Sequence, residues 1–550
     1  MKGDVAMATR KSPLAPPVDF AARGMLSQRG EMLKVTLRIV LSCALLFSAD
    51  LLSGADAPRY GGRLVLGIRN DITGLNPFLR TSSTNMYVRQ LMYESLLDFD
   101  KNGKAISALA ESWSVSPDGK FFTFKLRRGV KFHDGKDLAA EDVKWSVEYA
   151  LDPGNGATGF PILRSIEKVN AKDNFTVEFV LKYPDASFLS LVASIRPFSI
   201  VPSRSILTGK GDLPAYPPGT GPFVFKDYQT AREIVFARNK NYWRKGLPYL
   251  DELVLKPVLE DQVRFTALRA GDLDMIERTP YSFVPKILKG EFRELRTTMA
   301  KYAGYRRILF NVVDPPFSDV RLRQAVRYAV DKTKYIEGAF WGLGEPANQL
   351  FPNGNTWHVK LPEIKRDPAK VKAMLKEAGI NSEWEVELIG QGSEGEELQV
   401  LQQQLTTAGI KTKVTVLERG ARVKRESSGD FMMVLSGSDI PDDPAEEFEG
   451  EFGCAEEEVK AKRRTENSAG YCNKEVDRML GTAAKTREQK KRYELYAKVI
   501  QLFHDEVPDI PLAYVPRYYT YQQKVKGFAT DDDGRFNIPD AGLSRVWISQ

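Results

Sequence analysis

The run from Ala108 to Leu151, ALAESWSVSPDGKFFTFKLRRGVKFHDGKDLAAEDVKWSVEYAL, carries the clearest structural signals of the chain. Residues 116–119 (SPDG) predict a tight turn, because proline presets φ and Asp and Gly tolerate the backbone of a reversal. Apolar and polar residues then alternate over residues 122–127, which predicts a half-buried strand. A second short strand is expected at residues 130–132, before the turn at Asp134-Gly135.

A helix is expected from Glu141 onward, because Val143, Val147 and Ala150 recur at helical spacing. Its first turn carries Glu141 and Asp142, where the helix dipole favours anions. The pattern predicts a compact βαβ-type unit. It contains no nucleophile–base pair and no cluster of metal ligands.

This block resembles the extracellular solute-binding proteins of ABC importers, specifically family 5, the oligopeptide- and dipeptide-binding type. The resemblance rests on the run LAESW…DGK…FKLRRGVKFHDG…AEDVKWS. The family usually has Thr as a helix cap where Ala139 stands, and alanine cannot accept a hydrogen bond from the exposed N–H groups. The lost cap is worth roughly 1 kcal/mol and concerns stability rather than function.

Two further runs carry the same resemblance: GTGPF…RN…YW over residues 219–243, and FN…PPFSDVRLRQAVRYAVDK over residues 310–332. Strands, not a Lys-Ser/Thr helix, follow the glycines at 219–221, which argues against a nucleotide-binding loop. In the second run, Ser318 or Asp319 is expected to cap a helix. Helices and strands alternate further along the chain, which favours parallel-rich sheets with helices on their faces.

The resemblance covers nearly the whole mature chain and implies an α/β fold, a two-lobed clamshell of mixed sheets with an additional third domain. Lobe I is expected to be discontinuous, the extra domain II to be a single segment, and lobe II to be domain III. The expected boundaries are 58–100, 214–303 and 518–550 for lobe I, 101–213 for domain II, and 304–517 for lobe II.

Residues 1–57 predict an N-terminal extension followed by a secretory signal. Lys34 and Arg38 precede the apolar run 39–47, and Ala55-Asp56-Ala57 forms an A-x-A cleavage site. We therefore expect a periplasmic protein whose translation starts at Met1, Met25 or Met32. Lipid modification of Cys43 is the less favoured interpretation, because hydrophobic residues continue past it.

Two cysteines remain after cleavage, Cys454 and Cys472. An even pair in an oxidising compartment predicts a disulfide, and two free, buried thiols are the alternative. The chain of 550 residues has 79 basic and 72 acidic residues, a net charge of +7. This balance, without a basic stripe among aromatics, favours an ordinary solvated surface and no nucleic-acid partner.

Catalytic chemistry finds no support in the sequence. The three histidines, His133, His358 and His504, do not have the spacing of a metal site, and His133-Asp134 alone supplies too few ligands. No G-x-S-x-G motif is present, and the acidic residues 442–451 lack the glycine spacing of a calcium loop. We predict a protein that is not an enzyme and that has no metal and no cofactor.

The sharpest binding candidate is Asp439, in a Pro/Asp-rich turn after the apolar residues 431–434. In peptide-binding relatives a W-x-x-D run stands here, and its Asp pairs with the α-ammonium of the peptide. A structural turn cap is the alternative for Asp439. Ser436 replaces the tryptophan, so one wall of the side-chain pocket is missing.

Four other residues are candidates for the ligand cleft by position only, and a structural role is as good an interpretation for each. They are Leu75, Asn76, Ser83 and Tyr514. The resulting hypothesis is a monomeric receptor that captures di- or oligopeptides and delivers them to the transmembrane subunits of an ABC permease. A non-peptide solute (an oligosaccharide, an opine or a nickel chelate) is the alternative, and a secreted peptide hydrolase or an envelope chaperone is a rival from another class.

Overall fold

The computed structural model divides the chain into two units, Met1–Pro58 and Arg59–Gln550, and only the second is treated below. The described residues are 57–72, 74–78, 83–100, 104–155, 163, 165–194, 198–203, 217–380, 384–462, 464, 467–531, 534–535, 537–538 and 541–549. The expected signal segment, with Cys43 and the three candidate start methionines, lies outside them. Within the described residues, no helix is long and apolar enough to cross a membrane.

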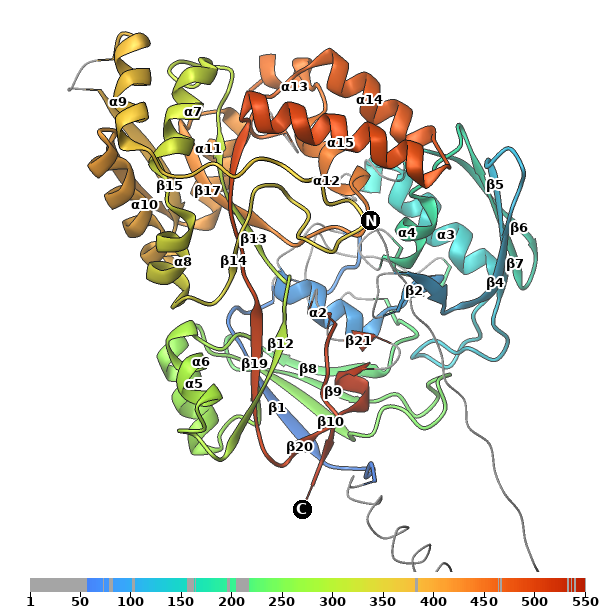
Figure 1. Ribbon diagram of the computed structural model, residues 1–550. Coiled ribbons are helices and arrows are strands. Elements are labelled where there is room, and N and C mark those ends of the chain that lie inside the picture. The colour runs from blue at the N-terminus through green and yellow to red at the C-terminus, as the bar shows by residue number, and fades with distance from the viewer. Residues whose placement is uncertain are drawn as a thin grey trace, which may run out of the picture. The chain divides into compact units, whose positions relative to one another are not determined.

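Three main sheets organise the second unit (Figure 1). The seven-stranded sheet has the order β12 (Leu295–Ala300), β19 (Arg517–Gln522), β11 (Met275–Ile276), β1 (Arg63–Ile68), β10 (Glu252–Pro257), β9 (Glu233–Arg238) and β8 (Phe223–Gln229). The six-stranded sheet has the order β14 (Glu345–Pro346), β18 (Asp509–Tyr514), β13 (Tyr305–Phe310), β17 (Met433–Ser438), β15 (Glu385–Gln391) and β16 (Lys411–Leu417). The four-stranded sheet has the order β4 (Ala110–Val115), β5 (Phe121–Leu126), β7 (Thr176–Leu181) and β6 (Ile166–Asp173).

Three two-stranded pairs complete the strands: β2 (Leu97–Phe99) with β3 (Ala105–Ser107), β20 (Val525–Lys526) with β23 (Trp547–Ile548), and β21 (Asn537–Ile538) with β22 (Ala541–Gly542). The α-helices are α2 (Ser83–Met92), α3 (Ala140–Leu151), α4 (Phe188–Ala193), α5 (Asp261–Ala270), α6 (Val284–Leu288), α7 (Val320–Ala329), α8 (Lys332–Phe340), α9 (Pro368–Glu377), α10 (Gly395–Ala408), α11 (Arg419–Ser428), α12 (Ala445–Phe452), α13 (Glu456–Lys460), α14 (Lys474–Lys485) and α15 (Gln489–Glu506). The domain boundaries expected above stay a prediction.

The strand directions correct one expectation. The four-stranded sheet is antiparallel throughout, since β5 pairs antiparallel with both β4 and β7 and β6 pairs antiparallel with β7. The segment 108–151 is therefore not a βαβ unit with parallel strands. The predicted second strand at 130–132 is also wrong, because only an isolated bridge from Lys131 to Asp137 forms there. The larger sheets are mixed: β1 pairs parallel with β10 and β11, and β15 with β16 and β17.

Helix α3 shows how the sequence compensates for its missing cap. Its N-cap is Ala139, which has no side-chain acceptor. The carboxylate of Asp142 accepts from the N–H of Ala139 at 2.8 Å and from the N–H of Ser203 at 2.6 Å, which is half of a capping box. Asp319, in contrast, caps α7 as expected, since its side chain accepts from the N–H of Arg321.

The six-stranded sheet is covered on both faces because its strands are apolar on both sides. Ile308 of β13 packs in a cluster with Leu322 of α7 and Leu401 of α10. Its neighbour Leu309 packs in a different cluster, with Ile500 of α15 and Phe448 of α12. This alternation is the period of two expected of a strand, and both faces are core.

The glycine motif at 219–221 packs against residues from other segments in the first half of the chain. A Cβ on Gly219 would lie 1.9 Å from the carbonyl oxygen of Met92, so only glycine fits. The carbonyl of Gly221 accepts from Asn239 Nδ2 at 2.9 Å and is 3.0 Å from Nε2 of His133. These residues have a structural role.

Glu94 is the polar centre of the same region. Its carboxylate accepts from Thr220 Oγ1 at 2.8 Å, Tyr242 Oη at 2.9 Å and Trp243 Nε1 at 2.8 Å. Burial raises its pKa, while Arg244 and the three donors act in the opposite direction. The GTG and YW parts of the motif therefore meet at one buried carboxyl.

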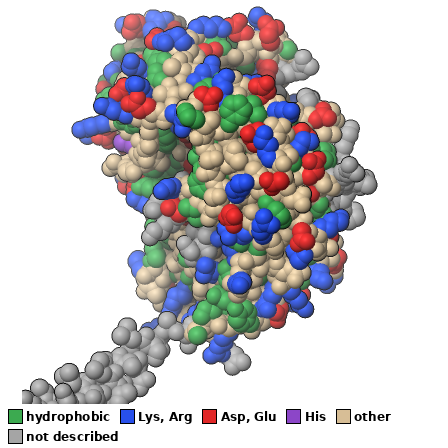
Figure 2. All heavy atoms as spheres, turned by 90° about the vertical axis from the view of Figure 1, so that its right-hand side faces the viewer, with side chains coloured by type: hydrophobic (Ala, Val, Ile, Leu, Met, Phe, Trp, Pro, Cys, Tyr) green, Lys and Arg blue, Asp and Glu red, His purple; other side chains and the backbone are tan. Residues whose placement is uncertain are grey.

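The surface agrees with the charge balance of the sequence. Figure 2 shows Lys and Arg side chains interspersed with Asp and Glu over the face that carries the four-stranded sheet.

Candidate functional site

The chain crosses between the two large sheets at two adjacent places, from β12 to β13 and from β18 to β19 (Figure 1). The crossings are hydrogen-bonded to each other: the N–H of Val515 donates to the carbonyl of Gly304 at 2.8 Å. Arg517 Nη2 donates to the carbonyl of Ala303 at 2.8 Å, and Tyr281 Oη donates to that of Pro516 at 2.8 Å. A pair of short connections at one edge is suited to act as a hinge between two sheets.

Beside these crossings lies the loop 439–443, which follows β17 and contains three aspartates, each paired with an arginine from another element. Asp439 Oδ1 lies 3.3 Å from Arg517 Nη2 on β19. Asp442 contacts Nη2 of Arg535 with both oxygens, at 3.0 and 2.8 Å. The third pair joins Asp443 to Arg492 of α15 through two hydrogen bonds of 2.8 Å each.

The three carboxylates differ in how much of each is left to solvent. The Asp443 side chain is only 6% exposed, and its pair with Arg492 is bidentate. Burial raises the pKa of Asp442, and Arg535 lowers it. Asp439 is 57% exposed and contacts an arginine that is itself 6% exposed. Asp439 is thus the carboxylate of this loop that a solute can reach.

Ser438 is a polar group that the sequence does not single out. Its Oγ is buried next to Asp439 and has no hydrogen-bond partner within the part of the chain that the structure describes. Buried hydroxyls are nearly always satisfied. A serine in a strand gives no sequence signal of whether its hydroxyl has a hydrogen-bond partner. Ser436, the candidate two residues earlier, is partly buried opposite Arg307 of β13.

Tyr281 is an aromatic side chain beside the same crossings. Its ring contacts Phe340 of α8 and Tyr518 of β19. Burial raises its pKa to about 12, and Arg278 and Arg517 oppose the rise. The tyrosine is therefore a neutral hydrogen-bond donor at physiological pH.

The other predicted cleft residues make structural contacts. Leu75 is buried in the core around the seven-stranded sheet. Asn76 is buried, and its Oδ1 accepts from the N–H of Phe78 at 2.9 Å. Tyr514 Oη donates to the carbonyls of Gln349 and Phe351 at 2.7 and 3.0 Å. Ser83 begins α2, and its side chain lies outside the described residues. A ligand contact stays a prediction for all four.

Comparison with known proteins identifies the class of this molecule. The family model described as "Bacterial extracellular solute-binding proteins, family 5 Middle" matches residues 104–455, more than half of the chain. The chain belongs to this family. The prediction made from the three sequence runs is confirmed, and the protein is a solute-binding protein.

Relatives of known name are similar to this chain over most of its length. The glutathione-binding protein GsiB of Pectobacterium atrosepticum is 30% identical over 495 residues, which cover 87% of this chain and 94% of the relative. GsiB of Escherichia coli K12 is 29% identical over 492 residues, with the same coverage of both chains.

Solved structures give the fold. The periplasmic binding protein DppA of Helicobacter pylori, in complex with the peptide STSA, superposes with a TM-score of 0.80 at 25% identity and covers 90% of this chain and 99% of its own. AgaA from A. tumefaciens R10, in complex with agropinic acid, gives a TM-score of 0.78 at 27% identity and covers 89% and 99%. The predicted fold class, a two-lobed binding protein with mixed sheets, is confirmed.

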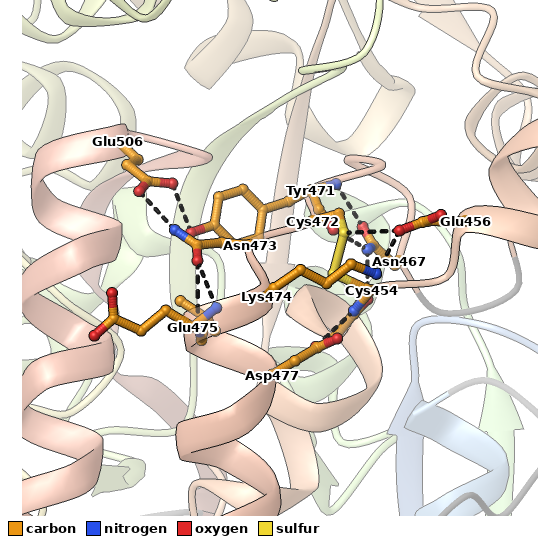
Figure 3. Close-up of a disulfide and its surroundings, with 12 residues drawn as sticks. Cys454, Glu456, Asn467, Tyr471, Cys472, Asn473, Lys474, Glu475, Asp477 and Glu506 are labelled. Atoms are coloured by element: carbon orange, nitrogen blue, oxygen red, sulfur yellow. Dashed lines mark hydrogen bonds and ion pairs between the residues drawn. A yellow bond between two sulfur atoms is a disulfide. The ribbon is translucent and has the colours of Figure 1, made fainter.

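The two cysteines of this solute-binding protein are joined in the structure (Figure 3). Cys454 follows α12 and Cys472 precedes α14, with a sequence separation of 18. The N–H of Cys454 donates to Asp477 at 2.8 Å, and Asn473 both caps α14 and donates to Glu506 at 2.8 Å. The disulfide therefore closes a loop whose two ends are also attached to α14 and α15.

No described group of three His, Cys, Asp or Glu residues could hold a metal ion. The histidine that most resembled a ligand, His133, is instead directed at the Gly221 carbonyl.

Proposed function

We propose that this chain is the periplasmic receptor of an ABC importer, and that it captures short peptides between its two lobes and presents them to a membrane permease. Asp439 receives the α-ammonium of the peptide. The observation that carries this assignment is the difference in exposure and pairing among the three aspartates. Asp442 and Asp443 form two hydrogen bonds each to an arginine, while Asp439 remains 57% exposed beside the hinge.

The physical chemistry supports recognition through the peptide terminus. A hydrogen bond between a carboxylate and an ammonium contributes roughly 1.5–3 kcal/mol, whatever the side chains of the ligand are. The existing contact between Asp439 and Arg517 is long and half exposed, and such pairs are worth about 0–1 kcal/mol. A ligand ammonium can therefore bind Asp439 without losing a strong internal interaction.

The names of the relatives support a ligand with a free amino group. GsiB is named for glutathione, and the DppA structure holds the peptide STSA. The second candidate is an opine or a similar non-peptide solute, favoured by the likeness to AgaA with agropinic acid and by Ser436, which leaves the side-chain pocket without an aromatic wall. Periplasmic export through residues 1–57 and a monomeric state belong to the same proposal, as does binding without catalysis.

The test uses the mature protein, from Pro58 onward, and titration calorimetry with glutathione, di- to pentapeptides, oligosaccharides, agropinic acid and nickel–histidine. We expect a peptide to bind, and Asp439→Asn to weaken it by about 10- to 150-fold, the equivalent of the ammonium contact. Asp430→Asn is the matched control, because Asp430 is a 75% exposed aspartate before the same strand. An N-acetylated peptide should bind the wild type and Asp439→Asn equally weakly.

Each other outcome changes a different part of the proposal. Equal affinity of the free peptide for the wild type and Asp439→Asn would remove the ammonium anchor. Binding of only sugars, opines or chelates would replace peptide as the substrate class. Recovery of a cleaved peptide from the calorimeter cell would contradict a pure binding role.

A further inference from the structure

A second polar site lies inside the half of the molecule built on the six-stranded sheet. A cavity of about 40 Å³ is lined from β13 and β18 on the sheet side and from α12 and α15 on the helix side. The polar side chains around it are Tyr305, Arg307, Arg327, Lys332, Asn348, Gln349, His504 and Asp509. None of its lining residues belongs to the 439–443 loop, so it is separate from the proposed peptide site.

Two buried donors at this cavity are left without an acceptor within the part of the chain that the structure describes. The Nε–H groups of Arg307 and Arg327 are both buried and have no hydrogen-bond partner among the described residues. Lys332 Nζ donates to the carbonyl of Ala347 at 2.5 Å and to Asn348 Oδ1 at 2.8 Å, which accounts for two of its three protons. Arg327 Nη1 donates to the backbone carbonyl of His504.

Carboxylates lie within ion-pair distance of one of the three cations, Arg307. Arg307 contacts Glu447 at 3.2 Å, Glu451 at 2.5 Å and Asp509 at 3.6 Å. Burial raises the pKa of Glu451 well above its usual range, and Arg307 acts in the opposite direction. Arg307 is thus a cation of this cavity that has carboxylates beside it.

The remaining two cations have no such compensation. In the described part of the chain, neither Arg327 nor Lys332 has a carboxylate within ion-pair distance. Both cations are half-buried. Removing a charge from water without a partner is costly, and a negative charge in the cavity would supply that partner.

We propose that this cavity is a binding site for one small monovalent anion, such as chloride or formate. The identity follows from the size of the cavity and from its unpartnered donors. A water molecule needs roughly 10–15 Å³ of such volume, so about 40 Å³ admits an ion of one to three heavy atoms and excludes an amino acid or a peptide. An anion accepts from every side and suits the two unpartnered Nε–H groups, whereas a water molecule must also donate.

The same site couples anion binding to protons. Burial and the nearby Arg327 lower the pKa of Lys332 to about 7, while Asp509 and Glu363 act in the opposite direction. His504, whose pKa burial also lowers, contributes no charge at neutral pH. An anion favours the charged ammonium, so binding takes up a proton and becomes tighter as pH falls through 7.

The experiment compares thermal melting of the mature protein in sodium chloride, sodium formate and sodium gluconate at equal ionic strength. We expect a higher Tm in chloride or formate than in gluconate, an increase that Lys332→Met abolishes. Lys334→Met is the matched control on the same helix, since Lys334 is 67% exposed and pairs with Glu337, and it should keep the increase. Peptide affinity should be the same in all three salts.

A second measurement covers the case in which Lys332→Met fails to fold. Crystals of the wild type soaked in bromide should show one anomalous peak between Lys332 and Arg327. Equal Tm values in the three salts, an increase that survives in Lys332→Met, or density for water alone at that position would each overturn the proposal.

Discussion

His133 connects the segment 108–151 to the glycine motif, and its burial makes stability depend on pH. Its Nε2 lies 3.0 Å from the carbonyl of Gly221, and its backbone N–H donates to the carbonyl of Gly219 at 2.8 Å. Burial lowers its pKa from 6.5 to about 4, against the raising effects of the Gly221 contact and Asp134. The neutral imidazole is therefore the form that the fold accepts.

The sign of the effect follows from proton binding. Between pH 6.5 and about 4 the unfolded chain protonates this histidine and the folded chain does not. The contribution to stability is fully present above pH 6.5 and is lost as pH falls through about 4. The difference between the two pKa values corresponds to roughly 3 kcal/mol.

The assay is urea unfolding of the wild type and His133→Gln at several pH values from 8 down to 4. Glutamine can still donate to Gly221 but does not titrate. We expect the stability difference between the two proteins to change by roughly 3 kcal/mol over this range, with the wild type losing more. The comparison cancels the titration of carboxylates that both proteins share. A constant difference would show that burial does not hold His133 neutral, and the reasoning would be refuted.

Two further predictions concern stability. Replacing Cys454 and Cys472 together by serine should cost about 3 kcal/mol, from a closed loop of 18 residues. Thiol titration of the unfolded mature protein should find no free thiol, and a reductant should destabilise the wild type but not the serine variant. Gly219→Ala should cost about 3 kcal/mol or more, because its Cβ would overlap the Met92 carbonyl. Gly481→Ala, on an exposed and open part of α14, should instead stabilise by up to about 1 kcal/mol, and unfolding curves of the two glycine variants that coincide would contradict the steric argument.

The sequence is informative wherever the determining interactions are local. Alternation predicts the strand β5, and an Asp followed by an apolar stripe predicts α7, because both depend on neighbours within a turn or two. The family and the fold class follow from runs that combine such local signals. The predicted strand direction is wrong in the four-stranded sheet, because alternation along a strand carries no information about its partner.

The cleft candidates show that local sequence does not predict the burial of a side chain either. Leu75 and Tyr514 are candidates by their place in the chain, and both are buried by residues distant in sequence. The hydroxyl of Tyr514 donates to carbonyls more than 160 residues away. No local pattern predicts such a partner, so position in the chain is a weak guide to exposure.

The loop 439–443 shows most clearly what tertiary structure adds. Its sequence offers Asp439, Asp442 and Asp443 as equivalent carboxylates in one turn-rich segment. The fold distinguishes them by bringing arginines from 49 to 93 residues away, and the best-paired carboxylate becomes the least able to bind a solute. Because Arg517 lies at the hinge crossing and contacts Asp439, a ligand ammonium at Asp439 would act on the segment that joins the two lobes. Ligand recognition and lobe movement would then share one residue pair, and a ligand would favour closure by its excess affinity for the closed form.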